Sequence, residues 1–423
     1  MAGPVGSRLF DTPVRETTLS NGLRIVTETV PHVYSVALGI RVDSGSRDET
    51  DDQAGISHLL EHMLFKGTDR RTARQIAEEL DGVGGQMDAF TSKEYAGYSA
   101  RVLSEHVPLA LDVIADMLRN SILDEDELEL EKSVILEEYK SMEDAAEDYV
   151  HEVFQQLLWP EHPLGRPVIG VPAVIERLSR DDLRRHLNEN YVPARLICVA
   201  SGAVQHDEFV AAVARQFGDL RGNSLPRVLV PPVAGRESRL IHRPLEQAHF
   251  CMGTVSVSEQ DPDRWPLRVL NLLLGGGMSS RLFQEIRESR GLCYSIGSEF
   301  ATFREGGCFN VYADTSPEHL PEVRRLVGEE LIKVADHGLT AAELERAKAQ
   351  VRAGTLLSLE DTGSRMNRIA RSMLYYGKVI PLSELVGFVE AVTLDDCRRV
   401  AADLIAGGEF AFAAIGPFGE GGK

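Results

Sequence analysis

The sequence predicts an α+β protein with two homologous domains, each a mainly antiparallel sheet packed with helices. Three observations support this fold class. The chain has 423 residues, which exceeds the size of one ordinary domain. Strand-like and helix-like segments are mixed without the strict alternation that produces a parallel sheet. The sequence also repeats itself at about half its length.

The repeat keeps a nearly constant offset. SRDDLRR at 179–185 returns as TLDDCRR at 393–399, and the apolar strand that ends at Gly202 returns as one that ends at Gly416, both at an offset of 214. DELELEK matches AELERAK at an offset of 216, a shift that a short loop insertion explains.

A proline- and glycine-containing stretch separates the two copies. Residues 221–238, RGNSLPRVLVPPVAGRES, have the composition of an exposed linker. We therefore predict an N-terminal domain over residues 1–220, a linker over 221–238 and a C-terminal domain over 239–423.

Periodicity identifies the elements of the first half. Alternating apolar and polar residues predict strands in LRIVTETV, SVALGIRVDS and GQMDAFTSKEYAGYSARV. Longer amphipathic stretches predict helices in TARQIAEEL and HVPLALDVIADML, and one long helix over residues 126–158.

Composition and charge exclude several classes of protein. The formal net charge of −20 argues against a nucleic-acid-binding protein and favours cationic partners. No apolar run reaches the roughly eighteen residues that would cross a membrane, and the N-terminus lacks the apolar stretch of a secretory signal. The 5 cysteines form no C-x-x-C pair, as expected for reduced thiols. We therefore expect a cytoplasmic protein.

The segment HLLEHMLF places three titratable side chains in an otherwise apolar run. On a helix, His58, Glu61 and His62 share one face, whereas Ile56 and Leu60 lie on the opposite face. Histidines at i and i+4 direct two imidazoles at a common point, as a tetrahedral zinc site requires. The order H-x-x-E-H is that of the inverted zinc peptidases, in which the glutamate reaches the attacking water. The alternative is an amphipathic helix whose polar face only meets solvent.

The helix predicted over residues 126–158 supplies a candidate third ligand. Glu131 and Glu138 fall two turns apart inside an apolar arc, whereas Glu137 points away from it. A carboxylate in an apolar stripe needs compensation, and a divalent cation provides it. Glu138 is therefore favoured over Glu137 as a ligand. Pairing of these carboxylates with arginine or lysine is the alternative.

These residues resemble the insulinase/pitrilysin zinc metallopeptidases, the inverzincin family. HLLEH is followed, 76 positions after His62, by Glu138, the last glutamate of EKSVILEE, as in the branch of mitochondrial processing peptidase and its bacterial homodimeric relatives. SGSRDE, AGISHLLEHMLFKGT and GGQMDAFTSKE are also similar to the first domain of that family. The similarity covers essentially the whole chain.

The resemblance implies one zinc ion per chain, held by His58, His62 and Glu138. Glu61 would activate the water that attacks the peptide bond, and Glu131 would lie behind a ligand and orient it. The implied function is a zinc metalloendopeptidase that hydrolyses peptides or unfolded polypeptide segments.

The second half lacks these ligands. At an offset of 213 the three titratable positions of H-x-x-E-H correspond to Asn271, Leu274 and Gly275. At an offset of 216 the position of Glu138 corresponds to Gly354. We therefore expect the metal site in the first half alone.

The second half instead carries Arg287 and Tyr294, which resemble the Arg-x6-Tyr pair of the family. In relatives this pair approaches the substrate and helps to hold the tetrahedral intermediate, a role that a guanidinium and a phenol suit. Relatives arrange four such domains around a chamber, so two domains per chain imply a homodimer. By analogy, Arg287 and Tyr294 would serve the zinc site of the other subunit.

The segment GGQMDAFTSKE resembles the edge strand of the family, which binds an extended peptide by β-addition. The resemblance implies that Ala89, Phe90 and Thr91 contribute to substrate binding; an ordinary internal strand is the alternative. The competing function is a non-catalytic core or partner subunit of a protein complex with the same fold. Such subunits typically lose the ligands that this chain retains.

Overall fold

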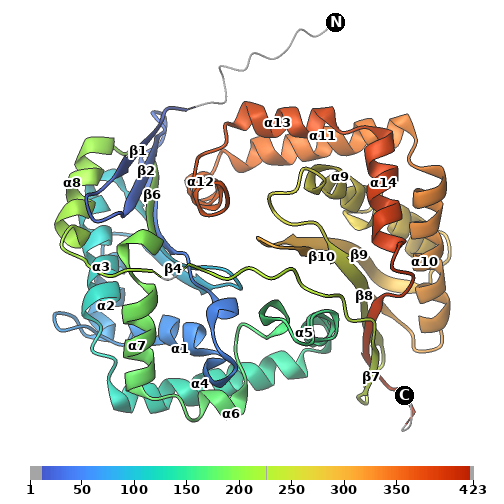
Figure 1. Cartoon of the computed structure of the whole chain (residues 1–423), viewed down its shortest axis with the longest axis horizontal. Coiled ribbons are helices and arrows are strands. Elements are labelled where there is room, and N and C mark those ends of the chain that lie inside the picture. The colour runs from blue at the N-terminus through green and yellow to red at the C-terminus, as the bar shows by residue number, and fades with distance from the viewer. Residues whose placement is uncertain (1–11, 225, 420–423) are drawn as a thin grey trace, which may run out of the picture. The chain divides into compact units, whose positions relative to one another are not determined.

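The computed structural model describes residues 12–224 and 226–419, which divide into two compact units. Unit 1 comprises Met1–Tyr139, Arg166–Arg227 and Leu356–Ser383, and unit 2 comprises Lys140–Gly165, Val228–Thr355 and Glu384–Lys423. Each unit has its own sheet (Figure 1), and each has its own hydrophobic core.

Unit 1 contains a six-stranded sheet in the order β1-β2-β6-β3-β5-β4. Its strands are β1 (Val14–Thr18), β2 (Arg24–Thr29), β3 (Ser35–Val42), β4 (Gln86–Thr91), β5 (Ala96–Leu103) and β6 (Leu196–Gly202). β2 and β6 run parallel, and the other neighbouring pairs are antiparallel. β4 is an edge strand, and β5 is its only partner strand within the described residues.

Helices cover both faces of this sheet. They are α1 (Ile56–Leu64), α2 (Ala73–Asp81), α3 (Val107–Asn120), α4 (Glu125–Asp144), α6 (Pro172–Ile175), α7 (Arg180–Asn190), α8 (His206–Phe217) and α12 (Thr362–Tyr376). Side chains from α1, α3, α7 and α8 form the larger core with one face of the sheet. Met366, Ile369 and Met373 of α12 cover the other face, so β6 is buried along its whole length.

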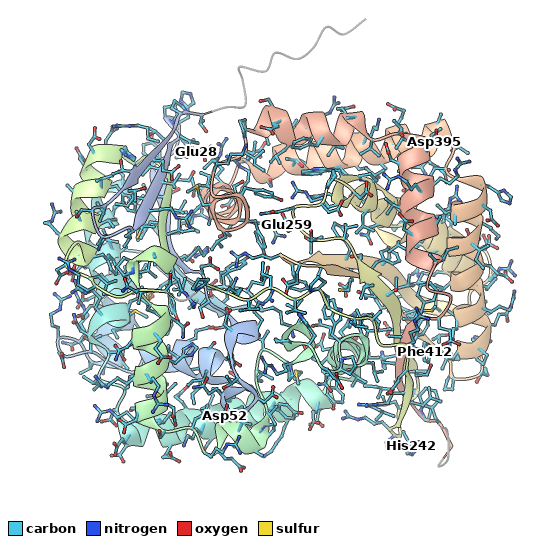
Figure 2. The ribbon with its side chains drawn as sticks, in the orientation of Figure 1. Glu28, Asp52, His242, Glu259, Asp395 and Phe412 are labelled. Carbon is cyan, nitrogen blue, oxygen red and sulfur yellow. The ribbon has the colours of Figure 1, made fainter. Side chains whose placement is uncertain are left out.

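Unit 2 contains a five-stranded sheet in the order β7-β11-β8-β10-β9. Its strands are β7 (Ser238–His242), β8 (Ala248–Ser256), β9 (Cys293–Thr302), β10 (Gly307–Thr315) and β11 (Ala411–Gly416). β7 and β11 run parallel, and the other pairs are antiparallel. Figure 2 labels Phe412 on β11. Its ring stacks on that of Phe250 with centroids 5.8 Å apart and so joins β11 to β8 inside the core.

The helices of unit 2 also lie on both faces of its sheet. They are α5 (Ala146–Leu158), α9 (Arg264–Gly275), α10 (Leu320–His337), α11 (Ala341–Ser358), α13 (Leu382–Ala391) and α14 (Leu394–Ile405), with a π-helical segment at Phe283–Glu288. α9, α10 and α14 contribute to the larger core. α5 packs on the opposite face, against side chains of β8 and β11.

The two sheets share one topology once β1 is set aside. β2, β6, β3, β5 and β4 correspond in order to β7, β11, β8, β10 and β9, and the parallel pair occupies the same place in both. The repeat in the sequence is therefore a repeat of topology. The predicted α+β class, with two mainly antiparallel sheets packed with helices, is confirmed.

The compact units differ from the predicted domain boundaries in two segments. Lys140–Gly165 precedes the predicted linker and yet belongs to unit 2, whereas Leu356–Ser383 follows the linker and belongs to unit 1. The physical reason is burial, because the apolar face of α5 packs on the unit 2 sheet and that of α12 on the unit 1 sheet. α5 begins at Ala146 and α12 begins at Thr362, an offset of 216 residues. The same offset relates DELELEK to AELERAK. The placement of each helix on the sheet of the other half is therefore part of the repeat.

The prediction of one long helix over residues 126–158 is wrong. α4 ends at Asp144 and α5 begins at Ala146, because Ala145 between them has φ −78° and ψ 87°, outside the helical region. The break separates an α4 that contributes to the unit 1 core from an α5 that packs in unit 2.

Among the described helices, none has both the length and the apolar composition needed to cross a membrane.

Candidate metal centre

α1 presents its titratable side chains because its other face is buried. The fully buried apolar side chains of this helix are Ile56, Leu59, Leu60, Met63 and Leu64. His58, Glu61 and His62 remain partly accessible. The separation of the two faces follows the helical periodicity read from the sequence.

Gly55 and Glu49 define the start of α1. Gly55 has φ +101°, and a Cβ at this position would lie 2.9 Å from the Cα of Gly170, so glycine is required. The carboxylate of Glu49 accepts hydrogen bonds from the backbone N–H groups of Gly55 (2.8 Å) and Ser57 (2.9 Å) and caps the helix. Burial raises the pKa of Glu49 to about 7, although these donors act in the opposite direction.

Glu131 on α4 links the second histidine to a lysine. Its Oε2 lies 2.9 Å from Nδ1 of His62, and its Oε1 lies 2.5 Å from Nζ of Lys66. Burial alone would raise the pKa of Glu131, but hydrogen bonds from Lys66 and His62 hold it below its usual value. An ionised Glu131 favours a proton on Nδ1 of His62 and leaves Nε2 free to act as a ligand.

Glu138, two turns further along α4, completes a cluster with both histidines. Its Oε2 lies 3.7 Å from Nε2 of His62, and the ring centroids of His58 and His62 are 4.7 Å apart. One potential ligand atom from each of the three residues lies within 4.8 Å of the other two. The side chain of Glu138 is 44% exposed, so one side of the cluster is open to solvent.

This donor set fits a zinc ion. Two imidazoles and one carboxylate are a ligand set that catalytic zinc takes, with a further position left for water. Nδ1 of His58 is buried without a hydrogen-bond partner among the described residues. Burial and the neighbouring His62 lower the pKa of His58 to about 4. His58 is therefore neutral at pH 7, as a ligand must be.

A threonine of the edge strand holds Glu61. Oγ1 of Thr91 donates a hydrogen bond of 2.6 Å to Oε2 of Glu61. Burial raises the pKa of Glu61, and the bond from Thr91 partly opposes this effect. A carboxyl with a raised pKa, held in one orientation, suits a group that accepts and returns a proton near neutral pH.

The residues predicted to bind substrate lie on β4, at the edge of the unit 1 sheet. Ala89 packs against the unit 1 core. The ring of Phe90 lies 5.1 Å from the guanidinium of Arg41 and 5.7 Å from the ring of Tyr95. Since the side chain of Thr91 bonds Glu61, all three side chains are engaged inside unit 1. The edge therefore offers backbone groups to a ligand, not these side chains.

Arg287 and Tyr294 lie in unit 2 and are neighbours there. Nε of Arg287 donates a hydrogen bond of 2.7 Å to the backbone oxygen of Tyr294. The guanidinium also pairs with Glu288 at 2.6 Å and lies 4.6 Å from the ring centroid of Phe283. Tyr294 is 74% exposed, so its phenol is available to a binding partner.

The positions in unit 2 that correspond to the cluster carry no ligands. Asn271, Leu274 and Gly275 lie on α9, and Gly354 lies on α11. Within the described residues, no side chain of α9 or α11 takes part in a three-residue group that could hold a metal.

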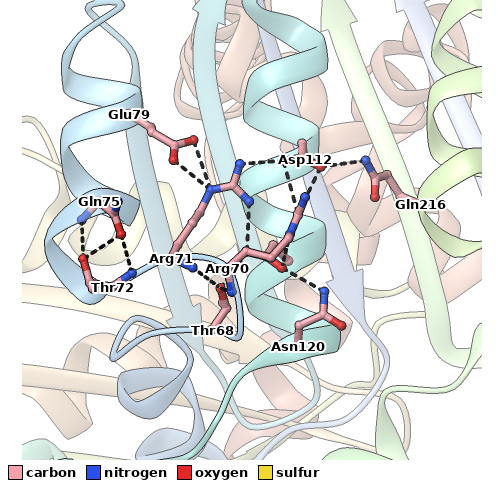
Figure 3. Close-up of polar contacts among 10 residues, drawn as sticks. Thr68, Arg70, Arg71, Thr72, Gln75, Glu79, Asp112, Asn120 and Gln216 are labelled. Atoms are coloured by element: carbon pink, nitrogen blue, oxygen red, sulfur yellow. Dashed lines mark hydrogen bonds and ion pairs between the residues drawn. The ribbon is translucent and has the colours of Figure 1, made fainter.

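The loop that follows α1 is tied to α3 by an ionic network (Figure 3). Arg71 donates to both Asp112 (2.6 Å) and Asp116 (2.9 Å), and Thr68 donates to Asp116 at 2.7 Å. Burial would raise the pKa of Asp116, but these hydrogen bonds and those from Arg70 and Asn120 lower it to about 2. The network holds in place the chain that leads away from Lys66.

The sequence did not indicate which residues form two contacts at the site, although Glu131 does pair with a lysine, as the alternative for that carboxylate allowed. Lys66 follows His62 by four residues, so helical spacing could have placed it beside the histidine, and a buried Glu131 signals the need for a cation. The bond between Thr91 and Glu61 joins a strand to a helix 30 residues away in sequence. No local pattern indicates such a contact.

Comparisons with known proteins assign both halves of the chain to one family. Residues 24–171 match the insulinase family, peptidase family M16, and residues 177–351 match the peptidase M16 inactive domain. An uncharacterized zinc protease of Streptomyces coelicolor is 43% identical over 414 residues, which cover 96% of this chain and 90% of that protein.

A eukaryotic relative and a solved structure extend this likeness. A probable mitochondrial-processing peptidase subunit beta of Arabidopsis thaliana is 34% identical, over 95% of this chain and 78% of that protein. The crystal structure of a protease from Helicobacter pylori superposes with a TM-score of 0.88 at 21% identity, covering 96% of this chain and 100% of that one. The structural likeness shows the same fold.

Proposed function

This chain belongs to the insulinase family of peptidases, M16, in the branch that includes mitochondrial processing peptidase, and we propose that it is a zinc-dependent endopeptidase. Its substrates would be peptides or unfolded segments of polypeptides. The observation that carries the proposal is the convergence of His58, His62 and Glu138 beside a glutamate held by Thr91.

His58, His62 and Glu138 are the residues that would hold the zinc ion, and Glu131 would orient His62 from behind. The bound ion would supply Lewis-acid chemistry, polarising the peptide carbonyl and increasing the acidity of the attacking water. Lys66 pairs with Oε1 of Glu131 and balances its charge. The other oxygen of Glu131 then faces His62.

Glu61 is the proposed general base and acid. Its carboxylate would accept a proton from the attacking water and return it to the nitrogen of the leaving amine. The hydrogen bond from Thr91 holds Oε2 of Glu61 and leaves Oε1 available for this transfer. Thr91 is therefore a positioning residue in this mechanism.

β4 is the proposed binding site for the substrate backbone. Its side chains at positions 89–91 are engaged within unit 1, so an added strand would be recognised through main-chain hydrogen bonds. Recognition of this kind requires an extended segment and places few demands on its sequence. Folded proteins would be rejected because their backbone is already paired.

The test of this function is peptide-library cleavage by the wild type and by Glu61→Gln, with zinc content measured on both proteins. The proposal expects equal zinc and cleavage by the wild type alone, because the substitution removes the proton acceptor and keeps the ligands. Equal cleavage by both proteins, or a wild type that holds zinc and cuts nothing in the library, would contradict it.

We also propose that two chains form a homodimer around a chamber, with Arg287 and Tyr294 acting on substrate bound at the zinc site of the other subunit. The support is the resemblance to four-domain relatives and the exposure of Tyr294. Mixing Glu61→Gln chains with Arg287→Ala chains should then restore activity, since one of the two sites regains both groups.

The control for this mixture is Glu61→Gln combined with a chain that carries both substitutions, which stays inactive in either arrangement. Absence of recovery in the first mixture, after mass spectrometry has shown subunit exchange, would assign Arg287 to its own chain. A monomer in solution would remove the dimer proposal itself.

A cytoplasmic location is proposed from the thiols. Cys198, Cys251, Cys293, Cys308 and Cys397 are free and buried. Burial raises the pKa of Cys198 above 9.0, so this thiol is unreactive. A reducing compartment is where such cysteines are usual.

A further inference from the structure

A second group of metal-type side chains lies on the unit 2 sheet, apart from every residue of the proposed peptidase site. His249 on β8, Asp314 on β10 and Ser295 on β9 are directly opposite one another across three neighbouring strands. Nδ1 of His249 lies 2.6 Å from Oδ1 of Asp314, and the hydroxyl of Ser295 donates to Oδ2. The row thus presents an imidazole and a carboxylate whose orientation a third side chain fixes.

The helix that packs on this face brings another carboxylate to the row. Glu147 lies in the first turn of α5, and one of its oxygens, one ring nitrogen of His249 and one oxygen of Asp314 all lie within 4.8 Å of one another. Glu147 and Asp314 border a cavity of about 300 Å³ that Asp148 and Glu299 also line. Three potential ligands therefore come from three separate elements, and two of them line a cavity.

The cavity carries an excess of negative charge. Asp314 pairs with His249, and Glu299 pairs with His151 at 3.1 Å. Within residues 12–224 and 226–419, no lysine or arginine forms an ion pair with the four carboxylates of the cavity: Glu147, Asp148, Glu299 and Asp314. Ionised carboxylates this close repel each other unless a cation lies between them.

This row is not a remnant of the metal centre in unit 1. The strand pairing shows which positions of the two sheets correspond. In unit 2, Ile415 of β11 lies opposite His249 of β8, and in unit 1, Ser201 of β6 lies opposite Ala37 of β3. Because Ser201 and Ile415 hold the same place in the repeated strands that end at Gly202 and Gly416, His249 corresponds to Ala37. Asp314 corresponds in the same way to the partner of Ala37 on β5, which is Arg101. An alanine and an arginine cannot ligate a metal, so the row belongs to unit 2 alone.

We propose that Glu147, His249 and Asp314 bind a divalent transition-metal ion, giving the chain a second metal site that is not part of the peptidase centre. One imidazole and two carboxylates form a donor set that Zn²⁺ and Mn²⁺ accept, whereas Mg²⁺ prefers oxygen ligands alone. The ion joins the first turn of α5 to β8 and β10, and its role is structural. Binding stabilises the unit because the ligands are brought together only in the folded state.

The test uses the full chain with His58→Gln and His62→Gln, which removes the first centre and leaves the second site to be measured alone. Zn²⁺ binding is followed by titration calorimetry and by the Tm at increasing Zn²⁺. The site predicts one equivalent bound and a Tm that rises with Zn²⁺. Adding Glu147→Gln should weaken binding at least about tenfold and abolish the rise in Tm.

Glu147 is exposed, so its replacement by glutamine leaves folding intact, and circular dichroism with the metal-free Tm verifies this. Asp148→Asn is the matched control, because it removes a neighbouring carboxylate of the same cavity from outside the three ligands. His249→Gln provides an independent loss of the second ligand. Mg²⁺ at the same concentration should not compete with Zn²⁺.

Each possible result decides the proposal. Absence of Zn²⁺ binding in the background variant, or binding that Glu147→Gln and His249→Gln leave unchanged, overturns it. An equal loss for Asp148→Asn and Glu147→Gln also overturns it, because that result shows a diffuse electrostatic effect and not a ligand set. Because the peptidase centre is absent from the background, the result does not depend on the proposed activity.

Discussion

In unit 1, helix α1 carries His58 and His62 toward Glu138, whereas in unit 2 the corresponding helix α9 carries Asn271 and Gly275. Both helices bury an apolar face against a sheet with the same strand order. The same strand order therefore accommodates a helix without these side chains. The comparison shows that core residues maintain the architecture, and that a few side chains on the opposite face carry the chemistry.

The titratable groups of unit 2 lie on a different part of its fold. His249, Asp314 and Glu147 gather on the sheet face that α5 covers, where unit 1 has Ala37 and Arg101 at the corresponding strand positions. The polar clusters of the two units therefore occupy different places on the shared topology. The metal centre of unit 1 can thus be altered with little effect on its sheet, and the following changes test this separation in order of expected effect.

Conversion of α1 to its counterpart should remove the activity and spare the fold. His58→Asn introduces the residue that unit 2 has at this position. Loss of a zinc ligand should lower kcat/KM by at least about a thousandfold, equivalent to about 4 kcal/mol of transition-state stabilisation. Zinc content by mass spectrometry should fall in parallel.

The control is the unfolding free energy of wild type and His58→Asn, measured by urea denaturation with a chelator present. We expect the two values to agree within about 1 kcal/mol, since His58 makes no hydrogen bond through its buried Nδ1. A variant that no longer unfolds cooperatively would show that this histidine belongs to the core of unit 1.

The buried cap of α1 should make the stability of the protein depend on pH. Glu49 has an unperturbed pKa of 4.5 and a folded-state pKa of about 7, because burial opposes its ionisation. The folded state then binds more protons than the unfolded state between these values. The contribution of Glu49 to the free energy of unfolding is fully present below pH 4.5. It falls as pH rises and is lost above about pH 7, a change on the order of 3 kcal/mol.

The measurement is the difference in unfolding free energy between wild type and Glu49→Gln at several pH values. Subtraction removes contributions of other groups, including His186 near the same helix start, whose pKa burial lowers to about 4 and whose effect has the opposite sign. The guanidinium of Arg166 and the N–H groups of Gly55 and Ser57 face Glu49 in the wild type. Parallel pH curves for the two proteins would contradict the prediction.

Removal of the hydroxyl that holds Glu61 should slow the reaction without loss of zinc. Thr91→Val deletes a 2.6 Å hydrogen bond to a carboxylate, and a bond to a charged group contributes about 2 kcal/mol. We expect kcat to fall about thirtyfold. KM and zinc content should change little, because β4 is proposed to bind substrate through its backbone.

Thr91→Ser is the matched control for this substitution. It retains the hydroxyl, so its kcat should remain close to that of the wild type. If serine and valine reduce kcat equally, the side chain at position 91 acts by packing and not by positioning Glu61.

Loss of the lysine behind Glu131 should weaken zinc binding. Lys66→Met removes the cation that pairs with Oε1 of Glu131 at 2.5 Å and keeps most of the side-chain volume. With its orientation less fixed, Glu131 should hold His62 less firmly, and zinc affinity should fall about tenfold. Competition with a chelator of known affinity measures this change.

Lys66→Arg retains the positive charge and should keep zinc affinity nearer the wild-type value. An unchanged zinc affinity in Lys66→Met would contradict a role for Lys66 in orienting Glu131. That result would mean that Glu131 is oriented by His62 and the packing of α4 alone.

The predictable part of the site depended on local spacing. His58 and His62 are one helical turn apart, and the position of Glu138 relative to Glu131 places both on one side of α4, so their faces follow from the helical period. The prediction that the histidines of α1 meet Glu138 of α4 came from the family resemblance. Burial of Glu131 and exposure of Glu138 were not distinguished by periodicity, because both fall inside the same arc.

The predictable part of the fold was its class and its duplication. Strand periodicity and a repeat at about half the chain length indicated two similar sheets, and the structure has them. The break at Ala145 was missed because amphipathic periodicity continues through it, and helix α5 was therefore joined to α4 in a single predicted helix. The apolar face of α5 could match either sheet, and only packing decides between them.

Spacing along the chain predicted the α+β class, the duplication and the shared face of His58, Glu61 and His62, whereas the family and the full ligand set came from the resemblance of these motifs to known proteins. Tertiary structure decided the exchange of α5 and α12, the contacts of Lys66 and Thr91, and the row of His249, Asp314 and Glu147. Those features join segments that are distant in sequence. Which segments meet is set by the burial of apolar faces and the register of strands, and neither is a property of any local stretch.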